Sequence, residues 1–469
     1  MRIFAGLAVA LFTIVAPGFW VTTLLVRRRL TIAEHLALAW LFGTAVTSLT
    51  LWMGGFVLRG LLLQAAMTTF CVVCGALGFR RWRELPSQGP TEAWKTADIV
   101  FMVLFALESI AMFWISFQQT LGWDGLTIWE LKARYAFLNG GALPSAYFSD
   151  VSRWFSHPEY PLLLPLTETW FYTWIGNCDQ FWIKLIFPIW YVAAMPIMLR
   201  AGEELSGRRW VGRMLVLVFP LLPCLHNAPG GFESGYADAP LAVIYAAAVF
   251  YLLRYVRDHS SQSLALCIAL ASTLPWMKRE GAILWGAISI CSALSILRQR
   301  TRLWLVALSF LPGLCIIIAW KIFLGALHAL PPRDFVAMRL DVLHSNLHHT
   351  MGILREVSKR MIQWHHWNIF WPMVALAGLC LLWRRRSRGV GVLFWLLLAP
   401  LSGYCASYVF SAWPDYTQHI RTSATRLLIQ ISPIGWLLIA LALARESTQE
   451  KLEPMAQRVG AGLEAEPSS

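Results

Sequence analysis

Residues 97–125, ADIVFMVLFALESIAMFWISFQQTLGWDG, combine a long apolar run with an acidic residue just beyond its end. The first 21 residues of this stretch are almost continuously apolar, and about 20 such residues are enough for one helix to cross the hydrocarbon core of a bilayer. A short polar segment follows, and Asp124 comes next. A carboxylate placed where a helix leaves the membrane is costly unless it is solvated, paired or used.

Long apolar runs of this kind recur along the whole chain. Of its 469 residues, 57% are hydrophobic and only 14% are charged, and the mean hydropathy is +0.56. Soluble domains do not have this composition. We therefore expect an all-α polytopic membrane protein with about 13 transmembrane helices. The expected spans are 3–25, 33–56, 60–79, 97–117, 181–199, 212–226, 238–254, 262–277, 280–297, 303–324, 367–383, 389–409 and 425–444.

The formal net charge of +13 would suggest nucleic-acid binding in a soluble protein. Here the basic residues lie in short tracts between apolar segments, which is typical of topology determinants, so no nucleic-acid partner is expected. The tracts occur at every second connection, and 13 spans place them all on the cytoplasmic side. This predicts a multi-pass protein of the cytoplasmic membrane with its N-terminus outside and its C-terminus inside. The tracts are 27–29, 80–83, 208–213, 254–257, 298–302 and 384–388.

The connections on the opposite side are long and have their own helical periodicity. Apolar stripes predict juxtamembrane helices at 127–138 and 346–364. The segment 161–175 is too short and too rich in proline for a span, so we expect it to form a helix that lies in the membrane interface. We expect three parts along the chain: an N-terminal three-span module at 1–90, a transmembrane catalytic domain at 91–445, and a disordered cytoplasmic tail at 446–469.

Five polar clusters fall on this outer side of the membrane. Together they contain carboxylates for proton transfer and cations for an anionic group. They are Trp123-Asp124-Gly125, with Lys132 and Arg134 on the following helix; His157 to Pro161, including Glu159; Gly235 to Asp238; Trp276 to Gly281, including Lys278 and Glu280; and His419 to Arg426, including Arg421.

Simpler structural roles remain open for the carboxylates among these residues. Asp124 and Asp238 each precede an expected helix and can cap it. Glu159 can pair with Lys132 or with Arg153. The sequence therefore leaves both a catalytic and a purely structural interpretation for each of the three carboxylates.

Structural roles are also open for four more charged positions. Lys278 and Glu280 can form an ion pair at the membrane interface, and the Arg426 side chain can extend outward to reach water. Glu108 lies near the middle of the fourth expected span, where a carboxylate is either functional or hydrogen-bonded to a neighbouring helix.

The order and spacing of five motifs resemble one family. The motifs are WDGLTIWELKA at 123–133, HPEYPLLLPL at 157–166, GYADAPLA at 235–242, KREG at 278–281 and HIRTSATRLLIQISP at 419–433. They resemble the GT-C glycosyltransferases, membrane enzymes that use polyprenyl-phosphate sugars and include protein mannosyltransferases and the aminoarabinose transferase of lipid A. The resemblance covers roughly residues 97–440.

The resemblance implies a role for several positions. Asp124 corresponds to the catalytic carboxylate of the first outer loop, and His157 and Glu159 lie in a motif lining the same cavity. Lys184 lies near a basic position at the mouth of the following span. The chain departs from the family pattern because Asp124 is not part of an Asp-x-Asp motif. No cofactor is therefore expected, although a divalent cation stays open.

The expected chemistry is inverting sugar transfer with Asp124 as general base. A phosphate leaves as an anion, so cations take the place of the second acid that a glycosidase needs. The donor is a polyprenyl-phosphate sugar, and the acceptor is a cell-envelope glycan, lipid or protein. Two different functions also fit the residues: a transporter or flippase of lipid-linked sugars, and a glycan ligase or polymerase. The residues expected to bind substrate or phosphate are Lys132, Lys184, Asp238, Lys278, Glu280, His419, Arg421 and Arg426.

Overall fold

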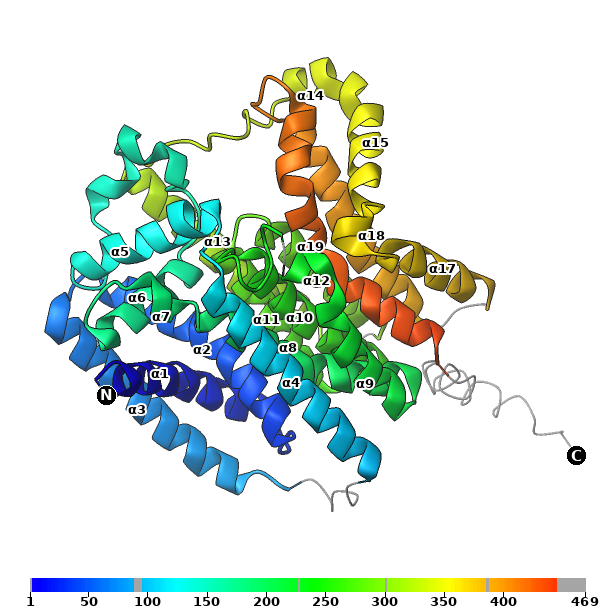
Figure 1. Ribbon diagram of the computed structural model, residues 1–469, viewed down its shortest axis with the longest axis horizontal. Coiled ribbons are helices and arrows are strands. Elements are labelled where there is room, and N and C mark those ends of the chain that lie inside the picture. The colour runs from blue at the N-terminus through cyan, green and yellow to red at the C-terminus, as the bar shows by residue number, and fades with distance from the viewer. Residues whose placement is uncertain (1, 88–94, 227, 300–301, 385–387, 445–469) are drawn as a thin grey trace, which may run out of the picture.

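A computed structural model describes residues 2–87, 95–226, 228–299, 302–384 and 388–444, and the tail expected to be disordered lies outside these ranges (Figure 1). Within them the chain is almost entirely helical. Ten helical segments are long and apolar enough to cross a membrane. They are α1 (Arg2–Leu25), α2 (Ile32–Gly54), α3 (Gly60–Glu84), α4 (Thr96–Gln118), α7 (Gln180–Ile183) continuing into α8 (Ile186–Ser206), α10 (Asp238–Asp258), α12 (Gly281–Arg298), α13 (Trp304–Ala326), α18 (Arg388–Val409) and α19 (Tyr416–Ala442).

The remaining described helices are shorter. The apolar helices α11 (Ser261–Met277) and α17 (Phe370–Trp383) fall below the length of a confident span. The others are the π-helix η1 (Gly125–Glu130), α5 (Leu131–Leu138), η2 (Ser145–Phe148), η3 (Val151–Ser156), α6 (Leu163–Ile175), α9 (Arg209–Val218), η4 (Phe219–Leu221), η5 (Pro223–Leu225), α14 (Leu340–Asn346), η6 (Leu347–His349), α15 (Thr350–Met361) and α16 (Trp364–Trp367).

The all-helical, multi-span architecture is confirmed, whereas the count of thirteen spans is not. The clearest difference is the span expected at 212–226. There α9 ends at Val218, and two 3-10 turns containing Pro220 and Pro223 follow. Proline lacks the backbone N–H that a continuing helix needs, so this segment returns across the bundle as a broken helix.

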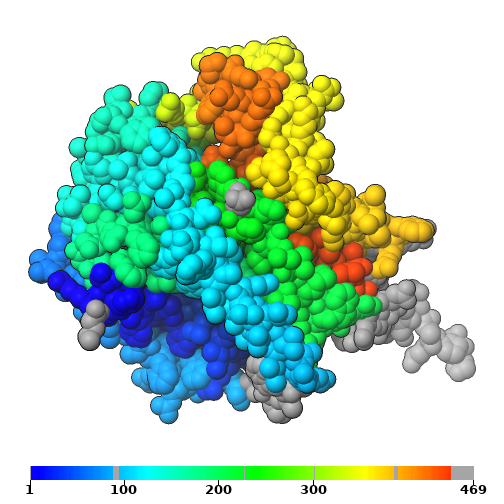
Figure 2. Space-filling view, in the orientation of Figure 1, coloured from blue at the N-terminus to red at the C-terminus, as the bar shows by residue number. Residues whose placement is uncertain are grey.

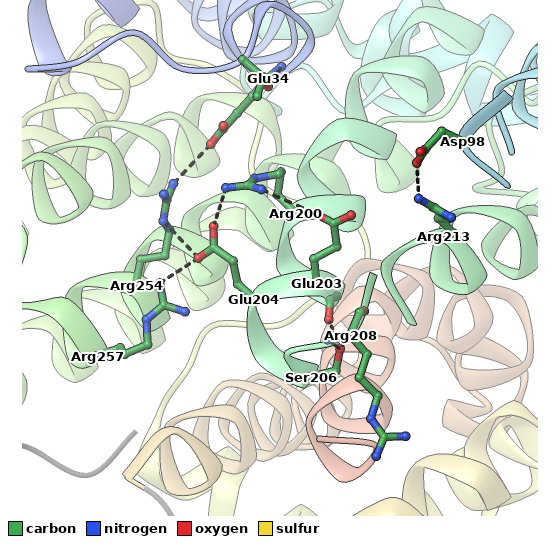
Figure 3. Close-up of polar contacts among 12 residues, drawn as sticks. Glu34, Asp98, Arg200, Glu203, Glu204, Ser206, Arg208, Arg213, Arg254 and Arg257 are labelled. Carbon is green, nitrogen blue, oxygen red and sulfur yellow. Dashed lines mark hydrogen bonds and ion pairs between the residues drawn. The ribbon is translucent and has the colours of Figure 1, made fainter. Parts of the chain in front are cut away.

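Ion pairs tie two of the basic tracts, 208–213 and 254–257, to neighbouring helices (Figure 3). Glu204 near the end of α8 accepts from Arg257 at 2.8 Å and pairs with Arg254 at 3.3 Å, both near the end of α10. Arg254 also reaches Glu34 at the start of α2, at 3.3 Å. The ends of α8 and α10 therefore meet the start of α2 at one face of the bundle, and the polar clusters lie at the other.

The N-terminal helices pack directly on the rest of the bundle. α1 and α2 cross where Gly18 faces the α2 backbone, since a Cβ at Gly18 would lie 1.9 Å from the carbonyl oxygen of Ala39. Small residues permit this close approach of membrane helices. Trp276 of α11 donates to Ser48 of α2 at 2.9 Å, which ties the expected N-terminal module to the middle of the chain.

The three predicted juxtamembrane regions are helical. Nearly all residues of α6, the helix expected at 161–175, are buried, because α1, α2 and α5 pack around it. In Figure 1, α14, α15 and the first turns of α19 stand together above the bundle. Figure 2 shows a notch between this group and the segment around residues 120–160.

Candidate functional site

Two adjoining cavities lie at the end of the bundle opposite the basic tracts. The wide cavity, of about 840 Å³, lies among the turn after α4, the loop before α10, the start of α19 and the connections that precede α14 and α19. The side cavity, of about 420 Å³, lies among the α11–α12 turn, α13, α18 and α19. Tyr160, Asp334 and Arg426 line both cavities.

Asp124 lies in the wall of the wide cavity, in the turn between α4 and η1. The glycines on either side explain the position of this turn. The Gly122 N–H donates to the carbonyl of Ser234 at 2.8 Å, and a Cβ on Gly125 would come within 2.4 Å of the same oxygen. Glycine at both positions therefore lets the turn lie directly on the loop before α10.

Arg426, from the third turn of α19, donates from Nη1 to Oδ2 of Asp124. The Asp124 side chain makes no capping hydrogen bond to η1, so the helix-cap explanation is wrong. The two side chains are only 22% and 20% exposed, and Nε of Arg426 has no hydrogen-bond partner among the described residues. A carboxylate thus meets a guanidinium that still has an N–H free to donate, at the place where the two cavities join.

Tyr236 completes this arrangement from the loop before α10. Its hydroxyl oxygen accepts from the Asp124 N–H at 3.1 Å, and the guanidinium of Arg426 lies 5.4 Å from the centre of its ring. Burial raises the pKa of Tyr236 to about 12, so the phenol keeps its proton. Because the oxygen is already an acceptor, the O–H is left to donate to a molecule in the cavity.

A second ion pair, between Lys278 and Asp238, is more deeply buried and lies at the wall of the side cavity. Lys278 donates to Oδ1 of Asp238 at 2.7 Å and lies 3.5 Å from Glu280. Gln430 of α19 donates to the same Asp238 oxygen at 2.5 Å. Burial alone would lower the pKa of Lys278, but Asp238 and Glu280 outweigh it and raise the pKa. Lys278 is therefore a permanent cation on the cavity wall, held by a carboxylate behind it.

Replacing Lys278 with methionine is expected to destabilise the fold by about 3–5 kcal/mol, because it leaves a buried carboxylate without its countercharge. Chemical unfolding in detergent micelles measures the loss. The double variant Lys278→Met with Asp238→Asn should recover much of it, since asparagine can still bind Gln430 without a charge. A loss below about 1 kcal/mol in the single variant, the range of an exposed pair, would contradict this account.

The segment that holds His157 is shaped by buried partners. His157 adopts a left-handed backbone conformation with φ of 49°, and its carbonyl accepts from Nζ of Lys132 at 2.6 Å. Its ring stacks on Tyr160 with 4.8 Å between centres, and Nδ1 lies 3.3 Å from Oε1 of Glu159. Arg279 also approaches Glu159, at 3.4 Å. His157 therefore faces the cavity, and Glu159, which lies behind the cavity wall, orients its ring.

The structure brings most of the expected site residues together. Asp124, His157, Arg421 and Arg426 line the wide cavity, and Lys278, Glu280, His419 and Arg426 line the side cavity. Arg421 pairs with Glu356 at 3.3 Å, and Nδ1 of His419 lies 2.8 Å from the Ser411 hydroxyl.

Four expected residues line neither cavity. Asp238 and Glu159 lie behind the walls, where they hold Lys278 and His157. Lys132 is fully buried, and burial lowers its pKa to about 7, with Glu159 opposing this change. Lys184 donates instead to the carbonyl of Gln119 at 2.6 Å. Glu108 accepts from Tyr191 at 3.4 Å and lines neither cavity, in line with a structural role.

Several cavity residues were missed from the sequence, chiefly in two connections that pair with each other. The Ala412 N–H donates to the carbonyl of Asp334 at 2.9 Å, and the Trp413 indole donates to its carboxylate at 3.0 Å. Oδ2 of Asp334 also lies 3.6 Å from Nε2 of His157. The signal available was a charged pair, Arg333 and Asp334, directly after two prolines in a long outer connection.

Comparison with known proteins identifies no family for this chain. No protein-family model, no curated protein and no solved structure matches the chain. Within the part of the chain that the structure describes, no three His, Cys, Asp or Glu side chains form a group suited to a metal ion.

Proposed function

We propose that the protein is an inverting membrane glycosyltransferase of the GT-C type, which moves a sugar from a polyprenyl-phosphate donor to an acceptor hydroxyl on the non-cytoplasmic face. The observation that carries the proposal is the Asp124–Arg426 pair at the junction of the two cavities. One partner can take a proton and the other can bind a phosphate, and a transfer reaction needs both within reach of one anomeric carbon.

In this mechanism the acceptor lies in the wide cavity with its reacting hydroxyl beside Asp124. The acceptor oxygen attacks C1 of the donor sugar from the side opposite the phosphate, and its proton passes to Asp124. The bond between C1 and the phosphate oxygen breaks, and its electron pair leaves with polyprenyl phosphate. A single displacement of this kind inverts the anomeric centre.

The phosphate is proposed to lie in the side cavity, beside Arg426 and Lys278. Arg426 can bind it through the Nε and Nη hydrogens in the fork geometry that suits phosphate. The Nε–H of Arg426 has no partner among the described residues and is available to the phosphate. A phosphate beside this guanidinium would share its positive charge with Asp124 and so weaken the hold of Arg426 on the carboxylate that acts as the base. Lys278 adds a point charge as negative charge grows on the leaving oxygen.

The polyprenyl chain would reach the side cavity along α13. Ile317, Trp320 and Lys321 of this helix line the cavity, and its outer surface carries exposed leucine and isoleucine side chains such as Leu314 and Ile318. A long lipid can therefore lie on the membrane-facing flank with its phosphate end turned into the cavity.

Transport of a lipid-linked sugar is less well supported by the geometry. Transporters place their ionisable residues near the middle of the membrane, between repeated halves of the chain. Here Asp124, Lys278 and Arg426 all lie at one end of the helices, and the carboxylate near the middle of α4, Glu108, accepts a hydrogen bond from Tyr191.

The test uses sealed membrane vesicles that contain the wild-type protein. Labelled polyprenyl-phosphate sugars are supplied one at a time, with a water-soluble glycan fraction from the host cell envelope as impermeant acceptor. Right-side-out vesicles are expected to form labelled glycan, and sealed inverted vesicles less than about a tenth as much until detergent admits the acceptor, as the proposed orientation requires. Movement of labelled lipid across the membrane without any glycoside would establish the transporter instead.

A further inference from the structure

The mouth of the wide cavity carries more cations than its carboxylates neutralise. Arg421, Lys359 and Arg360 all contact one carboxylate, Glu356, at 3.3, 3.2 and 3.1 Å. Arg333 lines the same cavity from the opposite connection, is exposed, and has no ion-pair partner among the described residues. On the proposed outer side of the membrane such a concentration of arginine is unusual.

Two further carboxylates, Asp415 and Asp334, offset part of this surplus, and Thr417 and Arg421 are among the groups that lower the pKa of Asp415. The four cations Arg333, Lys359, Arg360 and Arg421 still outnumber the three carboxylates Asp334, Glu356 and Asp415. Asp415, which precedes α19, accepts from the N–H and hydroxyl of Thr417 at 2.8 and 2.7 Å and caps the helix. The Asp334 carboxylate is bound to the Trp413 indole at 3.0 Å. The Arg333 guanidinium and the part of Arg421 turned away from Glu356 are thus left for an anion that enters from outside.

Aromatic rings lie beside these cations. Trp123, next to Asp124, is 75% exposed although it lines the cavity, and Phe155 is 38% exposed. Trp413 is held by its bond to Asp334 and by stacking on His419, with 5.0 Å between ring centres. Exposed rings on a cavity wall can pack against the C–H faces of sugar rings, which need an apolar surface beside polar groups.

The size of the cavity indicates a ligand of more than one sugar ring. Its volume of about 840 Å³ lies toward the upper end of the range of about 300–1,000 Å³ that small-ligand pockets span. Arg421 precedes Arg426 by five residues, which places it about 7.5 Å away along the helix axis at 1.5 Å per residue. An anion bound at Arg421 therefore lies beyond the ring that reacts beside Asp124.

We propose that the acceptor is a saccharide of two or more rings that carries a carboxylate or phosphate away from its reacting hydroxyl. The charge is bound by Arg333 and Arg421, and an adjacent ring packs on Trp123. This inference rests on the proposed transfer function, because it assigns the acceptor of the same site.

Binding is measured without turnover, so the result is independent of whether transfer occurs. Purified full-length protein in nanodiscs is titrated with maltotetraose, maltotetraose phosphorylated at one end, and tetragalacturonate. At least one anionic saccharide should bind about tenfold more tightly than maltotetraose, and the preference should shrink as added salt screens the charges. The phosphorylated and uronate probes distinguish the two sources of charge.

Substitutions separate the contribution of the two arginines to binding from that of Trp123. The double variant Arg333→Ala/Arg421→Ala should bring the preference for the anionic probe to within about threefold, whereas Trp123→Ala should weaken the neutral and charged probes by the same factor. Arg339→Ala is the matched control, because Arg339 is exposed, pairs with Asp341 at 2.9 Å and lies outside both cavities. The proposal is overturned if neither anionic probe binds more tightly than maltotetraose, or if the double variant keeps the preference. If charge-dependent binding holds but no transfer is found, the proposed reaction alone is wrong.

Discussion

Replacing Asp124 with asparagine is expected to lower the rate of sugar transfer by about 10²–10⁴-fold, the usual contribution of one positioned general base. Asparagine has nearly the same shape and its oxygen can still accept from Arg426, so the fold and the cavity wall should persist. It cannot take the proton of the acceptor hydroxyl. Single-turnover assays with saturating donor measure the chemical step. Donor binding should be unchanged or somewhat tighter, because a neutral asparagine competes less strongly than aspartate with the phosphate for Arg426.

The control for this variant is Asp341→Asn, which removes an exposed carboxylate outside both cavities. It should retain the wild-type rate. If Asp124→Asn also transfers sugar at the wild-type rate, Asp124 only holds Arg426 in place, and Glu280, on the wall of the side cavity, becomes the next carboxylate to test.

Replacing Arg426 with alanine is expected to damage both donor binding and transfer. A hydrogen bond to a charged group contributes about 1.5–3 kcal/mol, so the KM for the donor should rise about tenfold or more, and the loss of a cation at the leaving oxygen should lower kcat by about 10²–10³. Arg426→Lys keeps the positive charge but loses the paired N–H donors that bind phosphate in a bidentate geometry, so it should recover donor binding only in part. Steady-state kinetics at varied donor concentration separates the two effects.

Arg339→Ala serves again as the control, because it removes an arginine with no cavity contact. If Arg426→Ala lowers kcat but leaves the donor KM unchanged, Arg426 acts only on Asp124 and the phosphate is bound elsewhere. Thermal unfolding of each variant shows whether the loss of the Asp124 ion pair has disturbed the fold.

The apolar runs predicted the helices well because a membrane-spanning segment must satisfy its backbone hydrogen bonds internally. This constraint acts on each segment separately, so most span positions follow from local sequence. The broken helix after α9 was the main exception. There Pro220 and Pro223 interrupt a run whose hydrophobicity alone favoured a span.

The site was predicted less completely, since burial depends on the packing of distant segments. Lys132 and Lys184 looked like phosphate ligands because both are cations near the outer ends of helices. In the fold each donates to a single backbone carbonyl, of His157 and of Gln119. Arg333 and Asp334 were overlooked because their role depends on pairing with the connection before α19.

Local sequence was enough to predict a chain of apolar helices, which the structure confirms, and to single out the outer clusters from which most of the cavity-lining charged residues come. Whether a segment is apolar or charged depends only on its own residues, so these properties can be predicted from each segment of the sequence separately. Three features could be known only from the folded chain: Asp124 meets Arg426 across 302 residues, Asp238 and Glu159 lie behind the cavity walls, and Arg426 is one of the three residues that line both cavities. These outcomes depend on which helices pack together, because the choice of partner for a charged side chain is set by geometry that no single segment contains.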